Sequence, residues 1–349
     1  MAGKGEFGGK RMYYKFIEYY FKVINDKKFI KFGKELAHLL DIELEKNNNE
    51  VETVKNWVEN IKGKCVNDKY FKVCIDSLFI HAYNHSDNGS FPSGIEFDYY
   101  GNLGKAELAD ILFINSFYYN RKLILKKINF NQAKKQKNNS RWDIDEKQLY
   151  LLTRLPRFKG IKGSIVPQID FYIHSYCGNL TSYGLMNKEN FIFISADNIL
   201  LAKGNKKSVN LKDFRFIFDI NCFNECFKKY HCFEDYLRYK CYLPFFYSVL
   251  FSENTYKFIF SFIKGYIGEI VENEIFYYKN EEANNLLKGI LENIKTYGKK
   301  SNNKEILNFI SRFSDSDGIN IGNNEFEENN EGRGLAVVHI KIYLGMNYE

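Results

Sequence analysis

Acidic and amide side chains flank two apolar stretches, and their types suit divalent-cation chemistry on a phosphate ester. Glu107 and Asp110 precede an apolar run over 111–114, and a second, alternating run ends at Gln132 and Lys134. Carboxylate and amide oxygens are ligands that Mg²⁺ prefers, and a lysine beside them can orient a water and screen a phosphate. The two stretches therefore predict a phosphodiesterase site at the ends of neighbouring strands.

The elements that would position these residues are two strands and a helix. Residues 108–114 and 123–132 are expected to form adjacent antiparallel strands, with a turn at Asn120-Arg121 between them. A helix beginning after Asp145, as its N-cap, should pack on the same sheet. Were 123–132 helical instead, Gln132 and Lys134 would not share a strand face.

These motifs resemble the core of the PD-(D/E)xK (restriction-endonuclease-like) superfamily, in its variant with Gln before x-Lys. The resemblance covers roughly residues 75 to 200. It implies that Asp110 is the metal-binding aspartate, Gln132 the second ligand and Lys134 the catalytic lysine. Glu107 has no fixed counterpart in the superfamily.

The resemblance also implies a cofactor, Mg²⁺ or Mn²⁺, bound by Asp110, Gln132 and the Ala133 carbonyl. Glu107 or a glutamate on an earlier helix would assist, and the sequence does not choose among Glu35, Glu43 and Glu45. Two further side chains are accessory candidates. Gln148 would face the metal or phosphate, or only cap its own helix, and His81 would act as ligand or general base, or only shape a loop.

Basic residues cluster over 121–141, where no Asp or Glu occurs. The candidates for contacts with a nucleic-acid backbone are Arg121, Lys126, Lys127, Lys135, Lys137 and Arg141. Alone, this run is typical of a solvated hairpin rim; beside a metal site it predicts a phosphate-binding wall. The formal net charge of +7 is compatible with a nucleic-acid partner without requiring one.

The function predicted from these residues is a Mg²⁺-dependent nuclease that hydrolyses phosphodiester bonds, with DNA favoured over RNA. Fold-level analogy suggests DNA processing or prokaryotic antiviral defence, where a protein partner in a defence complex would be expected. The alternative is a non-catalytic nucleic-acid-binding or assembly subunit with a remnant site, because Gln132 brings no charge to the metal. A helical interaction module without chemistry is a third interpretation.

Length and composition indicate a globular α/β protein, with 349 residues of which 45% are hydrophobic. The expected fold is a mixed central sheet of restriction-endonuclease-like type, with an N-terminal helical segment and a C-terminal, mostly helical subdomain. The nuclease core would span 11–204, and the subdomain 205–349 would end in a strand that rejoins the sheet. Other expected strands lie at 70–80, 95–99, 168–175, 191–196 and 335–344, and helices at 11–62, 211–227, 233–264, 281–297 and 304–313.

The apolar segments are too short and too charged to predict a membrane span, and no signal peptide opens the chain. We therefore expect a cytoplasmic protein with no membrane partner, whose 7 cysteines are reduced thiols. One group of residues invites a zinc interpretation: Cys222, Cys226, His231, Cys232 and Cys241. Buried thiols are favoured, since no second close cysteine pair follows the first. Motifs for a P-loop, a Rossmann dinucleotide site or a nucleophile elbow are absent.

Overall fold

The computed structural model describes residues 4–47, 49–81, 92–136, 141–175, 179–214, 249–274, 279–313 and 334–345, with side chains from Tyr14 onward. The chain begins with three helices, α1 (Lys4–Ile24), α2 (Lys27–Lys46) and α3 (Glu50–Ile61). Asp26 and Asn49 cap α2 and α3, because each side chain accepts hydrogen bonds from the first free backbone N–H groups of its helix. The helical N-terminal segment is thus confirmed.

The core of the molecule is one mixed sheet whose strands come from nearly the whole described chain. Its members are β1 (Cys65–Asp68), β2 (Phe71–His81), β5 (Ile111–Tyr119), β6 (Lys122–Lys135), β9 (Thr181–Met186), β10 (Phe191–Ser195), β12 (Phe251–Ser252), β13 (Glu269–Asn273) and β14 (Gly334–Leu344). Their order is β1-β2-β14-β5-β6-β9-β10-β12, and β13 pairs with β6 beside β9. The β14–β5 and β6–β9 pairs are parallel, whereas the other pairs are antiparallel. A mixed central sheet is therefore confirmed.

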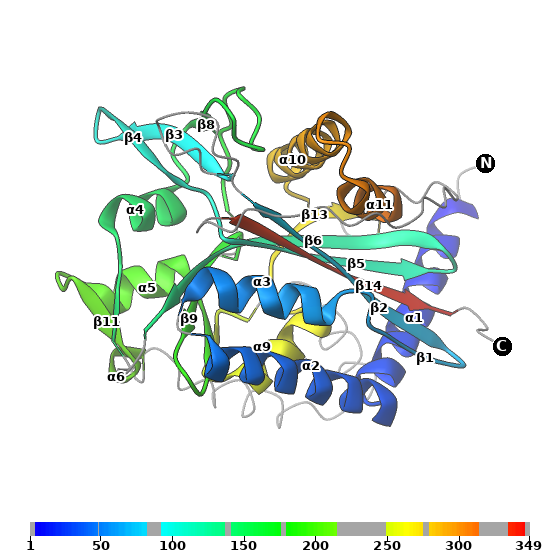
Figure 1. Cartoon of the computed structure of the whole chain (residues 1–349). Coiled ribbons are helices and arrows are strands. Elements are labelled where there is room, and N and C mark those ends of the chain that lie inside the picture. The colour runs from blue at the N-terminus through cyan, green and yellow to red at the C-terminus, as the bar shows by residue number, and fades with distance from the viewer. Residues whose placement is uncertain are drawn as a thin grey trace.

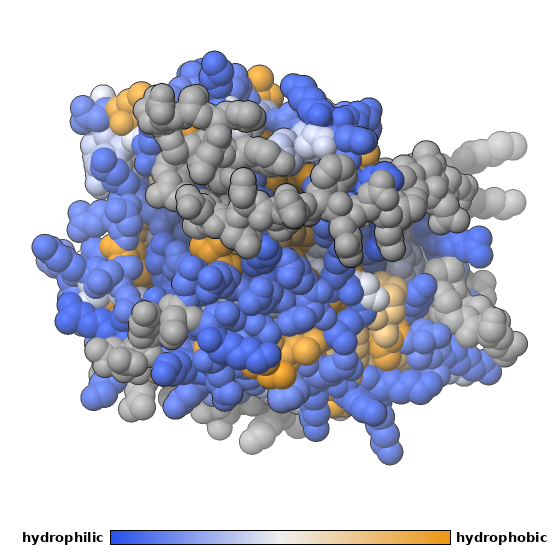
Figure 2. All heavy atoms as spheres, in the orientation of Figure 1, coloured by the Kyte–Doolittle hydropathy of each residue, from blue (hydrophilic) through white to orange (hydrophobic). Residues whose placement is uncertain are grey.

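Helices cover both faces of this sheet (Figure 1). On one side lie α1, α2, α3 and α9 (Thr255–Ile263), whose apolar residues form one core with the strands. On the other lie α10 (Glu281–Lys300) and α11 (Lys304–Phe313). The outward sides of α2 and α3 present mostly hydrophilic atoms (Figure 2). None of the described helices combines the length and apolarity that crossing a lipid bilayer requires.

A smaller layer of elements surrounds the β9 end of the sheet. The strands β3 (Gly94–Tyr99), β4 (Asn102–Glu107) and β8 (Phe158–Gly160) form a separate sheet, and β7 (Arg141–Asp143) pairs with β11 (Ser208–Asn210). Next to them lie α4 (Glu146–Arg154), α5 (Ala196–Lys203) and α6 (Leu211–Phe214). Asp145 is the N-cap of α4, as expected, since its side chain accepts a hydrogen bond from the backbone N–H of Gln148.

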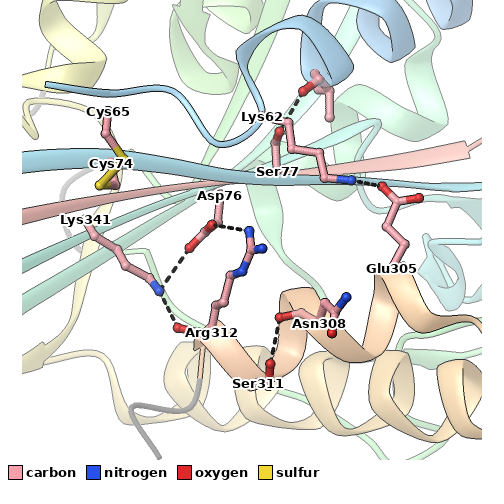
Figure 3. Close-up of polar contacts among 11 residues, drawn as sticks. Lys62, Cys65, Cys74, Asp76, Ser77, Glu305, Asn308, Ser311, Arg312 and Lys341 are labelled. Carbon is pink, nitrogen blue, oxygen red and sulfur yellow. Dashed lines mark hydrogen bonds and ion pairs between the residues drawn. A yellow bond between two sulfur atoms is a disulfide. The ribbon is translucent and has the colours of Figure 1, made fainter. Parts of the chain in front are cut away.

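An ion cluster links α11 to the strands β2 and β14 (Figure 3). The carboxylate of Asp76 on β2 lies 3.0 Å from the ammonium of Lys341 on β14, and 3.4 Å from the guanidinium of Arg312. The Lys341 ammonium also donates to the Arg312 carbonyl. Lys62, the C-cap residue of α3, and Glu305 make a second, more exposed link, between α3 and α11. The cluster therefore joins α11 to both β2 and β14.

Several sequence expectations need correction. Residues 168–175 form no strand: Phe171 makes one isolated bridge to Phe158, and Pro167 and the exposed Ile169 interrupt the pattern. The expected helix over 233–264 is described only from residue 249 onward. This part contains the short strand β12 and then the helix α9, so the helix is shorter than expected. The expected strand over 108–114 begins at Ile111.

Two of the cysteines are not free thiols. Cys65 on β1 and Cys74 on β2 are directly opposite in the antiparallel register, with Cα atoms 4.2 Å apart, and they form a disulfide. The expectation of reduced cysteines is therefore wrong for this pair. The group from Cys222 to Cys241, for which the sequence favours buried thiols over a zinc site, lies outside the described residues.

Candidate active site

Asp110 lies where β4 leads into β5, at the N-terminal end of an interior strand of the main sheet. Its backbone N–H donates to the Asn131 carbonyl at 3.0 Å, and its carbonyl accepts from the backbone N–H of Ala336 at 2.9 Å. Asp110 is thereby fixed to β6 on one side and to β14 on the other. Its side chain then turns toward β6, where the backbone N–H of Ala133 donates to Oδ2 at 2.8 Å.

Gln132 lies beside this carboxylate, as the antiparallel pairing of β5 with β6 predicts. The Gln132 side chain is buried, and its Nε2 donates to Asp110 Oδ2. Its Oε1 has no hydrogen-bond partner among the described residues. Both hydrogen bonds that the Asp110 carboxylate accepts in the described part of the chain go to Oδ2. Two oxygens, Gln132 Oε1 and Asp110 Oδ1, are therefore left for another ligand.

Lys134 ends the site on β6, and a glutamate from α3 approaches it. The Lys134 ammonium lies 3.9 Å from Glu50 Oε1, with about a quarter of the lysine side chain exposed. Glu50 Oε2 also accepts the backbone N–H of Lys135 at 3.2 Å. Glu50 stands in the first turn of α3, directly after the N-cap Asn49. The helix start thus delivers a carboxylate to the end of β6.

None of the three glutamates expected from the sequence takes this place. Glu35 pairs with Lys64 on the molecular surface, and Glu45 is exposed. Glu43 is buried, and its carboxylate accepts hydrogen bonds from the side chains of Asn47 and Asn60. Glu50 was missed because its role depends on how α3 docks against β6. The adjacent N-cap Asn49 is the one local signal that pointed to a helix start here.

The electrostatic environment of Asp110 is short of positive charge. Burial raises the pKa of Asp110 well above its ordinary value, and the carboxylates of Glu107 and Glu50 raise it further. The Lys134 ammonium and the Ala133 N–H act in the opposite direction without cancelling the effect. A cation bound at the Asp110 carboxylate would remove this penalty, because it would favour the ionised form.

The residues present fit a hard cation only if amide and carbonyl oxygens are included. No group of three or more His, Cys, Asp or Glu side chains within the described ranges is arranged to hold a metal ion. Asp110 Oδ1 and the unpartnered Gln132 Oε1 are nevertheless oxygen donors of the kind that Mg²⁺ takes, and the Ala133 carbonyl is the expected third. A site with so few charged ligands would keep much of the ion's water shell.

The basic residues expected to form a phosphate-binding wall are dispersed by the fold. Lys127 is buried and its ammonium donates to the Gly265 carbonyl at 3.1 Å. Lys126 pairs with Glu272 on β13 at 3.1 Å, so its charge is locally compensated. The Lys135 ammonium points inward and donates to the Leu44 carbonyl and to Thr53 Oγ1.

The other members of that run do not join the site either. Arg121 stands at the β5–β6 turn, at the opposite end of β6 from Lys134. The Arg141 guanidinium donates to Ser208 Oγ at 2.6 Å, within the β7–β11 pair. Lys137 lies outside the described residues. The described positions of the run therefore do not make one continuous basic surface.

The accessory candidates have different surroundings. Gln148 is buried in the first turn of α4, and its backbone N–H bonds to Asp145. His81 ends β2 opposite Gly334, so β14 separates it from Asp110, and its ring contacts Phe79. His85 lies outside the described residues. Glu107 ends β4, close enough to act electrostatically on Asp110.

Comparisons with known proteins give no relative from which a role for the site could be inferred. No protein-family model matches the chain, and neither a curated protein nor a solved structure is significantly similar to it.

Proposed function

We propose that the protein is a divalent-cation-dependent nuclease of the restriction-endonuclease-like type, with its site at Asp110, Gln132 and Lys134. The observation that carries the proposal is the meeting of an acid, an unpartnered buried amide oxygen and a lysine at the ends of two paired strands. Glu50 adds a carboxylate 3.9 Å from the lysine ammonium. This set supports hydrolysis of a phosphodiester, with DNA as the favoured substrate.

Each residue has a distinct role in the proposed reaction. Asp110, Gln132 Oε1 and the Ala133 carbonyl would hold Mg²⁺ or Mn²⁺, which when bound supplies Lewis-acid stabilisation of the phosphate. The Lys134 ammonium orients the attacking water and stabilises the negative charge that develops on the phosphate oxygens. Glu50 holds the lysine in place through their ion pair. Glu107 adds negative charge near the cation.

One further observation favours the alternative of a non-catalytic nucleic-acid-binding or assembly subunit. The described members of the basic run are buried, paired or distant from Asp110, which reduces the positive charge available to grip a substrate beside the site. In that case the Asp110 site would be a remnant, and binding would occur without cleavage.

For the nuclease itself, the proposal includes a cytoplasmic role in prokaryotic defence, together with a protein partner.

The test is a cleavage assay on single- and double-stranded DNA and RNA, with Mg²⁺ or Mn²⁺ and with a chelator. Cleavage that requires the cation and is lost in Asp110→Ala supports the nuclease. Glu50→Gln should reduce the rate, whereas the matched change Glu52→Gln in the same helix turn should not. Cation-independent binding with no cleavage of any substrate would favour the alternative.

A further inference from the structure

Tyr183 is a buried side chain that lies beside the site without any assigned role. It stands on β9, directly opposite Gln132 in the parallel β6–β9 register. Neighbouring strands lie about 4.8 Å apart, and side chains at matched positions project from the same face of the sheet. Tyr183 therefore shares the face of Gln132, and its side chain is fully buried.

The Tyr183 hydroxyl has no hydrogen-bond partner among the described residues. Buried hydroxyls are nearly always paired with a protein group or an ordered water, so a further hydrogen-bond partner is expected for this one. Two carboxylates lie near it. After burial itself, the charges of Asp145 and Asp110 are what raise the pKa of Tyr183, which places the phenol within electrostatic reach of both.

Three polar side chains thus lie at neighbouring register positions, on the turn before β5, on β6 and on β9. Among the described residues, the Tyr183 hydroxyl and Gln132 Oε1 have no hydrogen-bond partner, and both hydrogen bonds to the Asp110 carboxylate go to Oδ2, which leaves Oδ1 as a further acceptor. Polar groups that are close but not in direct contact are commonly bridged by a buried water, which needs two to four such partners. A hydrated cation, which Mg²⁺ remains in most protein sites, brings waters of this kind.

We propose that Tyr183 is a positioning residue of the candidate site, whose hydroxyl donates a hydrogen bond to a water held against Gln132 and Asp110. By fixing this water, Tyr183 holds the two oxygens that take the cation in their binding arrangement. The inference rests on the proposed function and deepens it, because it adds a residue that works through the water and does not touch the substrate. The competing role is purely structural, with the ring filling the core between β9 and α4.

The test is Tyr183→Phe, which removes one oxygen atom and keeps the ring. Isothermal titration with Mn²⁺ alone measures cation affinity without a substrate, and thermal unfolding measures stability. We expect Mn²⁺ to bind about five- to tenfold more weakly to Tyr183→Phe, the effect of losing one hydrogen bond. The matched control is Tyr20→Phe: the Tyr20 hydroxyl donates to the Lys264 carbonyl, away from the site, so this variant should lose stability but not Mn²⁺ affinity.

The possible outcomes separate the two proposals. Unchanged Mn²⁺ affinity in Tyr183→Phe, in a wild-type background that binds Mn²⁺, overturns the role of Tyr183 and leaves the proposed nuclease standing. No Mn²⁺ binding to the wild-type protein overturns both. Should Tyr183→Phe not fold, Tyr183→Met, which fills the space with an adaptable apolar chain and has no hydroxyl, carries the same comparison.

Discussion

Replacing Gln132 by glutamate should make the stability of the protein depend on a divalent cation. Gln132 Nε2 donates to Asp110 Oδ2. A glutamate there removes that donor and places a second carboxylate against Asp110, whose pKa is already raised by burial and by Glu107. The same substitution adds charge to the proposed metal site, so it should strengthen cation binding.

The size of the effect follows from these contacts. Losing a hydrogen bond to a charged group costs about 1.5–3 kcal/mol, and repulsion adds to this until one carboxyl takes up a proton. We therefore expect a loss of about 3 kcal/mol in the free energy of unfolding without a cation. For a chain of 349 residues the unfolding entropy is about 0.7 kcal/mol per kelvin, so Tm should fall by about 4 °C. A cation at a hundred times its Kd returns about 2.7 kcal/mol.

The assay is thermal unfolding of both proteins in chelator and in a Mg²⁺ series. The control is Gln168→Glu, an exposed position where the same change of charge should leave Tm and its Mg²⁺ response unaltered. A Gln132→Glu protein as stable as the wild type in chelator, with no larger gain from Mg²⁺ than the control, would refute the assignment of Gln132 as a ligand facing Asp110.

Three further changes test the site and the fold. Asp110→Asn should abolish cation-dependent cleavage. It should also raise Tm at neutral pH when no cation is added. The pKa of Asp110 is higher in the folded protein than its ordinary value of 3.8, so the ionised carboxylate lowers stability as the pH rises above 3.8. The difference in Tm between the variant and the wild type should therefore vanish below that pH. Lys134→Ala should lower the cleavage rate about a hundredfold or more with little change in substrate affinity, whereas Lys122→Ala, at the far end of β6, should change neither in kinetic assays. Asp76→Ala should cost about 3–5 kcal/mol in chemical denaturation, because Lys341 would be left buried and uncompensated, while Glu305→Ala, which breaks an exposed pair, should cost less than about 1 kcal/mol.

Local periodicity was enough to predict the elements that carry the site. The alternation before Gln132 and Lys134 predicts a strand, and the structure pairs that strand antiparallel with β5 as expected. The helices over 281–297 and 304–313 also appear, because their apolar residues recur at helical spacing and are buried on one side. Patterns of this kind depend only on neighbours in the chain.

Three of the failed predictions involve contacts between elements that local spacing in the sequence does not encode. Glu50 reaches Lys134 because α3 docks at the end of β6, and no spacing in the sequence encodes that meeting. The basic run over 121–141 is not a continuous positive surface, in part because β13 brings Glu272 from far along the chain into an ion pair with Lys126. The Cys65–Cys74 pair follows from the β1–β2 register, which places the two residues opposite one another.

The place of β14 has a consequence for how the protein folds during synthesis. This strand separates β2 from β5, although residues 120–333 lie between β5 and β14 in the chain. Until residues 334–344 emerge from the ribosome, β2 and β5 each present an unpaired edge, and Asp110 lacks the backbone partner that Ala336 supplies. Folding dominated by such distant pairing is slow and exposes apolar strands to aggregation. The nascent chain should therefore depend on chaperones until its last described strand closes the sheet.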